Sequence, residues 1–331
     1  MIKRSITFVS LALALSTMCQ AQSRKVIHLP SWDFSRDGNV WSQVAVPHDW
    51  AIAGPFDKKW DLQMVAIEQN GEKEKTEKSG RSGALPWIGE GMYKMNLQLP
   101  KGYKRAVLVF DGAMSQPVVS VNGKEAGRWA YGYNAFRIDI TPYVKFGGKK
   151  NLVEVHLNNV EESSRWYPGG GLYRPVSVEL YGNENFSTWD TFVRTLKADK
   201  QEAEVEVNAL LEGKIGKSGK TVIALLDEAG TKVAEQTISG AAPAIKTTLK
   251  VANPQLWSPE SPYLYQVKLT RYEGKKVADV QTLKTGIRTI SVSKNNGFQL
   301  NGITRKIKGV CLHHDLGPLG AAENKAALIR Q

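Results

Sequence analysis

The sequence predicts a mainly β protein that contains two successive β-sandwiches and the beginning of a third domain. Short segments of alternating apolar and polar residues recur from residue 25 to residue 182, separated by turns and without a convincing amphipathic helix. This spacing favours a jelly-roll β-sandwich. Similar segments continue to residue 290 at the rhythm of an immunoglobulin-like sandwich. A continuous apolar run at 310–312 is then typical of a strand buried on both faces, as in a parallel sheet or a barrel.

The first 21 residues have the pattern of a secretory signal peptide. Lys3 and Arg4 give a basic start, Ile6 to Leu15 form an apolar stretch, and Ala21 is a small residue at a cleavage point. We therefore expect export to the periplasm or the medium. No later stretch approaches the roughly 20 apolar residues of a membrane span, so no stable membrane anchor is expected.

Cysteine use and charge exclude several classes of function. Cys19 would suit a lipid-modified cysteine, but its context is poor and simple cleavage after Ala21 is favoured. The mature chain then keeps one cysteine, Cys311, which we expect to be an inert thiol in a buried strand without metal-ligand spacing. The formal charge of +12 becomes 12 − 2 = +10 without Lys3 and Arg4. Its lysines are scattered through turns, so no nucleic-acid partner is expected. The sequence has no phosphate loop and no dinucleotide fingerprint, and the adjacent His313 and His314 would point to opposite faces of a strand, so no cofactor or metal is expected.

The jelly-roll domain is expected at residues 22–183. The Asn122-Gly123 dipeptide in this domain, like Asn301-Gly302 near the end of the chain, favours a tight type I′ turn. A charged segment at 68–83 reads as a long exposed loop. The predicted strands lie at 44–46, 92–99, 106–110, 118–121, 136–140, 152–157 and 176–181.

The immunoglobulin-like sandwich is expected at residues 184–290. Without a Cys…Trp…Cys signature, this prediction rests on roughly seven short strands in about 100 residues. Residues 291–331 form the third part: a hairpin with its turn at Asn301-Gly302, the buried strand, and a helix from Ala321 to Gln331 where the chain stops. A single strand of this kind cannot bury itself, so the sequence reads as cut short at the start of a further domain.

Five motifs follow one another along the chain. They are Val46-Pro-His-Asp-Trp50, Arg165-Trp-Tyr-Pro-Gly-Gly-Gly-Leu-Tyr-Arg-Pro175, Leu256-Trp-Ser-Pro-Glu-Ser-Pro-Tyr-Leu-Tyr265, Gly286-Ile-Arg-Thr-Ile290, and Gly297-Phe through Asp315. Taken in this order, they resemble glycoside hydrolase family 2, and in particular its exported β-galactosidase-like members. The resemblance covers essentially all of the mature chain, and it implies a jelly-roll sugar-binding domain, an immunoglobulin-like domain and then a truncated (β/α)8 barrel.

The resemblance implies a retaining mechanism with two glutamates, one acid/base and one nucleophile. Retention needs the two carboxyl groups about 5 Å apart across the scissile bond. In the family both lie on later barrel strands, which would follow Gln331. Acids such as Asp139 and Glu161-Glu162 belong to the sandwiches, so the chain alone is expected to be inactive and no catalytic residue is assigned.

The end of the predicted barrel strand carries the candidate sugar contacts. The family places a histidine after Gly-Val in Gly-Val-Asn-Arg-His-Glu, and His313 matches it. Here Cys311-Leu312 replace Asn-Arg and His314 takes the place of Glu, so His314 or Asp315 could share the role. Paired donors and acceptors suit the recognition of hydroxyl stereochemistry. The alternative is that one histidine pairs with Asp315 and braces the loop.

Other candidates lie in the first domain. Asn158-Asn159 follow a predicted strand, at the position from which some family members extend an amide to the sugar. An Asn-Asn pair after a strand is also typical of a simple turn. Trp166 and Tyr167 would suit a stacking platform for a sugar ring, but beside three glycines they also suit packing. We interpret Pro47 to Trp50 as structural, with polar groups that pin a loop.

The resulting hypothesis is an exported, retaining exo-β-glycosidase, most simply a β-galactosidase, acting on a carbohydrate substrate. The enzyme alternatives are β-glucuronidase and β-mannosidase. An alternative of another class is a secreted carbohydrate-binding protein without catalysis. In that case the C-terminal tail should be ordered against the sandwiches, whereas the enzyme-fragment hypothesis expects a loose, easily proteolysed tail. A homo-oligomer is left open for the full-length enzyme.

Overall fold

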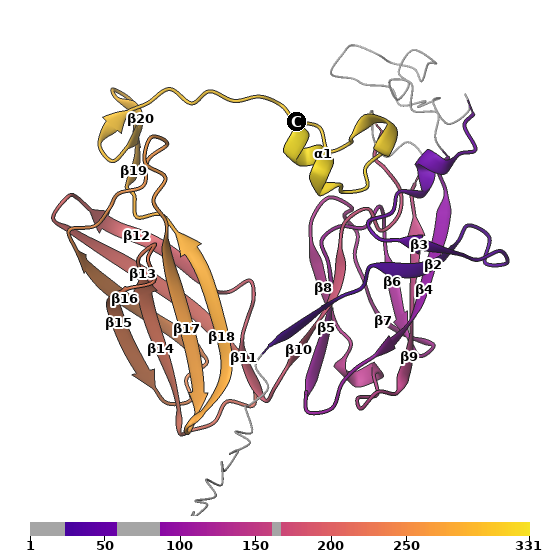
Figure 1. Cartoon of the computed structure of the whole chain (residues 1–331), viewed down its shortest axis with the longest axis horizontal. Coiled ribbons are helices and arrows are strands. Elements are labelled where there is room, and N and C mark those ends of the chain that lie inside the picture. Colours follow the sequence, from indigo (N-terminus) through magenta and orange to yellow (C-terminus); the bar gives the residue numbers. More distant parts are fainter. Residues whose placement is uncertain (1–23, 58–86, 161–166) are drawn as a thin grey trace, which may run out of the picture.

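The computed structural model describes residues 24–57, 87–160 and 167–331. The proposed signal peptide at 1–21, the predicted loop at 68–83, Glu161-Glu162 and Trp166 lie outside the described residues. Figure 1 shows two β-sandwiches side by side, and a C-terminal segment that returns from the second to the first. The expected mainly β fold is confirmed.

The first sandwich packs a six-stranded sheet, in the order β3-β2-β4-β9-β6-β7, against a four-stranded sheet in the order β1-β10-β5-β8. Neighbouring strands within both sheets are antiparallel. The strands are β1 (Lys25–His28), β2 (Ser31–Ser35), β3 (Ser42–Ala45), β4 (Glu90–Gln98), β5 (Arg105–Phe110), β6 (Val118–Val121), β7 (Lys124–Arg128), β8 (Phe136–Asp139), β9 (Lys150–Asn158) and β10 (Val176–Tyr181). Short 3-10 helices lie at η1 (Trp50–Ala53) and η5 (Thr141–Tyr143).

Alternation along the strands builds the core of this sandwich. In β9 every second residue is buried, including Val153, Val155 and Leu157, because successive side chains of a strand point to opposite faces. Phe110 and Phe136 stack between neighbouring strands with ring centroids 4.7 Å apart. The Asn122-Gly123 turn has positive φ at both residues (52° and 76°), so this predicted tight turn is confirmed.

The second sandwich has its own apolar core. One sheet centres on the long strand β13, with β12 and β16 along its sides and β11 at its C-terminal end; the other has the order β15-β14-β17-β18. The strands are β11 (Glu184–Phe186), β12 (Phe192–Ala198), β13 (Glu202–Gly213), β14 (Gly219–Leu226), β15 (Lys232–Ser239), β16 (Ala244–Ala252), β17 (Tyr265–Glu273) and β18 (Lys276–Thr285).

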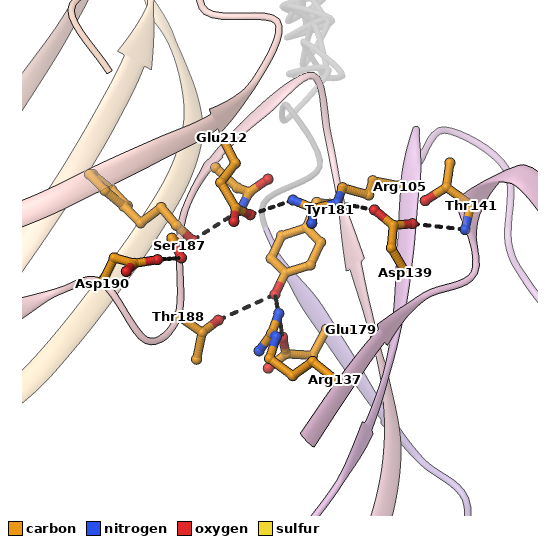
Figure 2. Close-up of polar contacts among 12 residues, drawn as sticks. Arg105, Arg137, Asp139, Thr141, Glu179, Tyr181, Ser187, Thr188, Asp190 and Glu212 are labelled. Carbon is orange, nitrogen blue, oxygen red and sulfur yellow. Dashed lines mark hydrogen bonds and ion pairs between the residues drawn. The ribbon is translucent and has the colours of Figure 1, made fainter. Parts of the chain in front are cut away.

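Charged groups join the two sandwiches (Figure 2). Arg105 of β5 bonds Asp139 of its own sandwich at 2.8 Å and also forms an ion pair with Glu212 of β13. Arg24, just before β1, donates to the carbonyl of Phe186 at 2.7 Å and pairs with buried Asp279 of β18 at 3.3 Å. The relative placement of the sandwiches is therefore held by polar contacts between residues far apart in the sequence.

A small antiparallel sheet follows the second sandwich, with strands β19 (Ile290–Ser293), β20 (Gly297–Leu300) and β21 (Ile303–Thr304). Asn301 and Gly302 form its second turn with φ of 52° and 76°, as predicted. The chain then passes through η6 (Gly317–Leu319) to the helix α1 (Lys325–Arg330). The helix starts later than predicted because Asn324 caps it, accepting a bond from the Ala327 N–H at 3.1 Å. No helix in the described ranges has the length and apolar character to cross a bilayer.

The predicted buried strand after Gly309 is not formed. Val310 is 94% exposed and Leu312 73% exposed, and Cys311 is exposed as well. The prediction that Cys311 is buried is therefore wrong for this structure. The physical reason is the lack of neighbours: within the described residues no strand lies beside 309–312 to pair with its backbone or cover its faces.

Candidate functional site

The segment from His313 to Glu323 returns to one end of the first sandwich (Figure 1). The Ala321 N–H donates to Asp49 Oδ2 at 2.8 Å, and the Glu323 N–H donates to the Tyr173 carbonyl at 2.8 Å. His314 Nε2 lies 3.2 Å from the carbonyl oxygen of Pro168. The tail is thus exposed up to His313 and ordered against the sandwich beyond it, so the expectation of a loose tail is wrong for residues 314–323.

The Asp49 carboxylate is the centre of this contact. It is buried, and it accepts bonds from the N–H groups of Ala51 (3.0 Å), Gly170 (3.1 Å) and Ala321 (2.8 Å) and from the Tyr167 hydroxyl. Burial raises the pKa of Asp49, and these hydrogen bonds oppose that rise. The prediction that Asp49 pins a loop is confirmed.

His48 is structural as well. Its Nδ1 lies 2.7 Å from the Tyr93 hydroxyl, and its ring meets the Phe34 ring edge-on at a centroid distance of 5.1 Å. Burial, followed by the positive charge of Arg36, lowers the pKa of His48 to about 4. The ring is therefore neutral at neutral pH.

The three glycines of the quoted motif provide the close approach that the sequence predicts. A Cβ on Gly170 would lie 2.4 Å from Trp50 Nε1, and one on Gly171 would lie 2.4 Å from the Tyr93 hydroxyl oxygen. Gly169 and Gly171 also have φ of 77° and 107°, which favour glycine. The rings over this backbone come from Trp50 and Tyr93, which are distant in sequence.

The predicted sugar contacts around His314 separate into different environments. His314 is half-buried, and its ring meets Tyr133 edge-on at 5.2 Å and Tyr173 at 6.3 Å. His313 is exposed. Asp315 Oδ1 accepts a bond from the Gly317 N–H at 3.2 Å. Neither histidine pairs with Asp315 within the described part of the chain, so the bracing partner of His314 is the Pro168 carbonyl instead.

The asparagines at the end of β9 also differ from each other. Asn158 bonds Ser115 through its backbone, its N–H donating at 2.9 Å and its carbonyl accepting from the Ser115 hydroxyl at 2.7 Å. Asn159 is buried and donates from Nδ2 to the Gly169 carbonyl at 2.7 Å. Asn159 therefore supports the loop of Gly169 to Gly171, called the glycine loop below. The half-buried Asn158 side chain makes no hydrogen bond with another described residue.

Comparison with known proteins decides the family. The model for glycosyl hydrolases family 2 matches residues 187–288. A β-galactosidase of Bacteroides ovatus is 36% identical over 302 residues, which cover 88% of this chain and 33% of that protein. The chain belongs to glycosyl hydrolases family 2.

Other relatives of this family 2 chain agree. A β-glucuronidase of Bacteroides fragilis is 28% identical over 360 residues, covering 98% of the chain and 47% of that protein. A solved family 2 structure from Bacteroides cellulosilyticus superposes with a TM-score of 0.78 at 32% identity, over 92% of this chain and 40% of that one. The chain spans about a third of the length of the first relative.

Two tyrosines of this family 2 chain lie at the site although the sequence analysis does not select them. Tyr133 and Tyr173 contact the His314 ring, and the Tyr173 hydroxyl donates to the Gly132 carbonyl at 2.8 Å. Burial raises the pKa of Tyr173 to about 12, so it remains a neutral donor. The alternation of aromatic and small residues from Trp129 to Tyr133 is the signal that would have indicated this loop.

This end of the family 2 chain brings together side chains that can donate and accept hydrogen bonds. An exposed imidazole, a carboxylate and several aromatic rings lie within one short segment and the loops it contacts. The described residues contain no group of three or more metal-ligating side chains. Tyr167, which donates to Asp49 and packs against the core, fits the packing interpretation better than a stacking platform.

Proposed function

We propose that this protein is an exported, retaining exo-β-glycosidase, and specifically a β-galactosidase that releases a terminal β-linked sugar from glycans. The observation that carries the proposal is the 36% identity with the Bacteroides ovatus β-galactosidase across 88% of the chain. Export is part of the proposal and rests on residues 1–21; secreted protein that begins at Gln22 would support it.

In this proposal the first sandwich holds one wall of the sugar site. The exposed imidazole of His313 contacts a hydroxyl of the terminal sugar, and His314, held by Pro168 and two tyrosines, orients the segment. Asp315 and the Asn158 amide are further hydroxyl partners. Trp166 keeps its proposed role of contacting a sugar ring.

The two catalytic glutamates are proposed to belong to a barrel domain that follows this chain. The most prominent acids of the described sandwiches already have structural partners: Asp139 pairs with Arg105, and Glu184 is buried against Arg271 at 3.2 Å. Such paired carboxylates are poor candidates for the two catalytic groups of a retaining enzyme. We therefore expect the chain of 331 residues to bind sugar without hydrolysing glycosides.

The test is a substrate panel with the full-length enzyme: the 4-nitrophenyl β-glycosides of galactose, glucuronic acid and mannose. Hydrolysis of the galactoside at the highest kcat/KM, with retained configuration by NMR, supports the proposal. His313→Ala should raise KM roughly ten-fold, as expected for one lost hydrogen bond. His28→Ala is the matched control, because His28 is an exposed histidine of β1.

β-Glucuronidase is the second candidate, because the β-glucuronidase of Bacteroides fragilis matches 98% of the chain. Preference for the glucuronide in the same panel would favour it over galactosidase, and preference for the mannoside would indicate a mannosidase. Sugar binding with no hydrolysis of any glycoside would instead indicate a carbohydrate-binding protein and contradict the enzyme proposal.

A further inference from the structure

A second feature of the first sandwich is a hollow of about 470 Å³ beside the loop that joins β7 to β8. This volume is within the range of roughly 300–1,000 Å³ typical of small-ligand sites. Its walls are mostly apolar and aromatic, with polar groups at the rim. The lining residues are Gln116, Val118, Arg128, Trp129, Ala130 and Tyr131.

The aromatic wall is held in a fixed orientation although it is open to solvent. Trp129 is 39% exposed, yet its ring stacks on buried Phe136 at 5.7 Å and its Nε1 donates to Asn134 Oδ1 at 2.8 Å. Its backbone N–H donates to the Pro117 carbonyl at 3.0 Å. The indole face therefore needs no reordering to receive a ligand, which lowers the entropic cost of binding.

The rest of the loop is anchored in the same way. Tyr131 is 58% exposed, and its ring meets Tyr133 edge-on at 5.6 Å. Between them, Gly132 accepts the Tyr173 hydroxyl bond at 2.8 Å, and a Cβ on Gly132 would lie 2.4 Å from Met114 Sδ. The exposed ring of Tyr131 therefore stands on a loop that is anchored at the adjacent Gly132.

The rim suits a neutral, hydroxyl-rich ligand. Arg128 is bidentate with Glu125, from Nε at 2.9 Å and Nη2 at 2.8 Å, so its charge is balanced locally. Gln116 has a positive φ of 47°, and its side chain makes no hydrogen bond with another described residue. A phosphate would need an uncompensated cation here, whereas a hydroxyl needs only donors and acceptors.

The hollow is also close to the proposed sugar site. Tyr131 contacts Tyr133, and Tyr133 contacts the ring of His314 at 5.2 Å. A chain of aromatic contacts thus leads from the hollow to the segment that carries His313. Two surfaces connected in this way suit successive parts of one oligosaccharide.

We propose that this hollow binds a pyranose unit of an oligosaccharide substrate, on the leaving-group side of the terminal sugar. The inference rests on the proposed function. The C–H groups of a pyranose face carry partial positive charge and suit the negative faces of Trp129 and Tyr131. Gln116 and Arg128 then meet the equatorial hydroxyl groups at the ring edge.

The experiment is calorimetric titration of the full chain with β-1,4-galactotetraose and, separately, with galactose. We expect the tetraose to bind at least ten-fold more tightly than galactose, and Tyr131→Ala to weaken tetraose binding at least ten-fold. Trp129→Ala should have a similar effect, with its fold checked by circular dichroism because Trp129 packs on Phe136. Phe192→Ala, a 58% exposed aromatic residue on the second sandwich, is the matched control and should bind as the unaltered chain does.

Two results would overturn the inference: no binding of galactotetraose, cellotetraose or mannotetraose, or tetraose binding that Tyr131→Ala leaves unchanged. Failure of the proposed function has a different signature. It would appear as no hydrolysis of 4-nitrophenyl glycosides by the full-length enzyme while tetraose binding to this chain, sensitive to Tyr131, persists.

Discussion

The buried carboxylate of Asp49 connects three separate stretches of the chain. Its four hydrogen bonds come from the first turn of η1, from Tyr167 and Gly170, and from Ala321 near the C-terminal end. None of these donors has another acceptor among the described residues, so each would lose its partner without the carboxylate. A side chain that serves so many donors contributes more to stability than its exposed counterparts.

We expect Asp49→Ala to lower the free energy of unfolding by on the order of 3 kcal/mol, because several buried donors lose their acceptor. Asp49→Asn should cost less, since it keeps one acceptor oxygen and loses the other. Urea unfolding measures both changes. Protection of residues 313–323 from proteolysis should decrease from the unaltered chain to Asp49→Asn and then to Asp49→Ala. Equal stability of these three proteins would contradict the proposed role of Asp49.

His48 should make stability depend on pH. Its pKa is about 4 in the folded chain and ordinarily 6.5, so between these values the unfolded chain binds a proton that the folded chain does not. The contribution of neutral His48 to the free energy of unfolding is therefore fully present above pH 6.5 and is lost as pH falls towards 4. The total loss is on the order of 3 kcal/mol.

His48→Gln should remove this contribution. Urea unfolding from pH 4 to 7 would then show a shallower loss of stability in the variant, whereas His28→Gln should keep the slope of the unaltered chain. Parallel curves for His48→Gln and the unaltered chain would show that the His48 imidazole does not titrate in this window.

At the scale of elements, the glycine loop shows what the sequence does and does not predict. Three glycines between aromatic residues correctly predict a path with no room for side chains. The sequence cannot indicate that Trp50 and Tyr93 are the covering rings, because that contact depends on packing between segments far apart in the chain. The run at 309–312 shows the converse: apolar residues favour a strand, but a strand also needs neighbours to pair with.

Gly170→Ala should therefore destabilise the first sandwich by about 1–3 kcal/mol, because its Cβ would press on the buried indole of Trp50. Gly309→Ala is the matched control, since a Cβ there meets no atom within 4 Å. Thermal unfolding measures both, and a Gly170→Ala protein as stable as the control would mean that the loop can shift away from Trp50.

At the scale of the whole molecule, the rhythm of short strands predicts two sandwiches in order, but not how they meet. The contact depends on Arg105 with Glu212 and on Arg24 with Asp279, pairs separated by 107 and 255 residues. Isolated charged residues are common on solvated surfaces, so nothing in their local sequence distinguishes these four.

Arg105→Ala should weaken the coupling between the sandwiches by about 1 kcal/mol, the scale of a partly exposed ion pair. Calorimetry should then show the unfolding transitions of the two sandwiches moving apart. Arg128→Ala removes an arginine whose partner Glu125 lies in the same hairpin, and it should leave the separation unchanged. A single transition, unaltered by Arg105→Ala, would show that other contacts dominate the interface.

The C-terminal tail contacts both sandwiches and so forms a second connection between them. Arg305 is tied to Glu260 of the second sandwich at 2.9 Å, His314 is tied to the first, and residues 306–312 between them are exposed. Residues 306–312 therefore act as a linker that keeps the segment 314–323 close to its binding surface on the first sandwich. Each doubling of the length of a flexible linker costs only about 0.6 kcal/mol in the free energy of bringing its ends together. Residues 306–312 should therefore accept inserted glycine and serine residues, or a reporter peptide, without loss of the contact between residues 314–323 and the first sandwich.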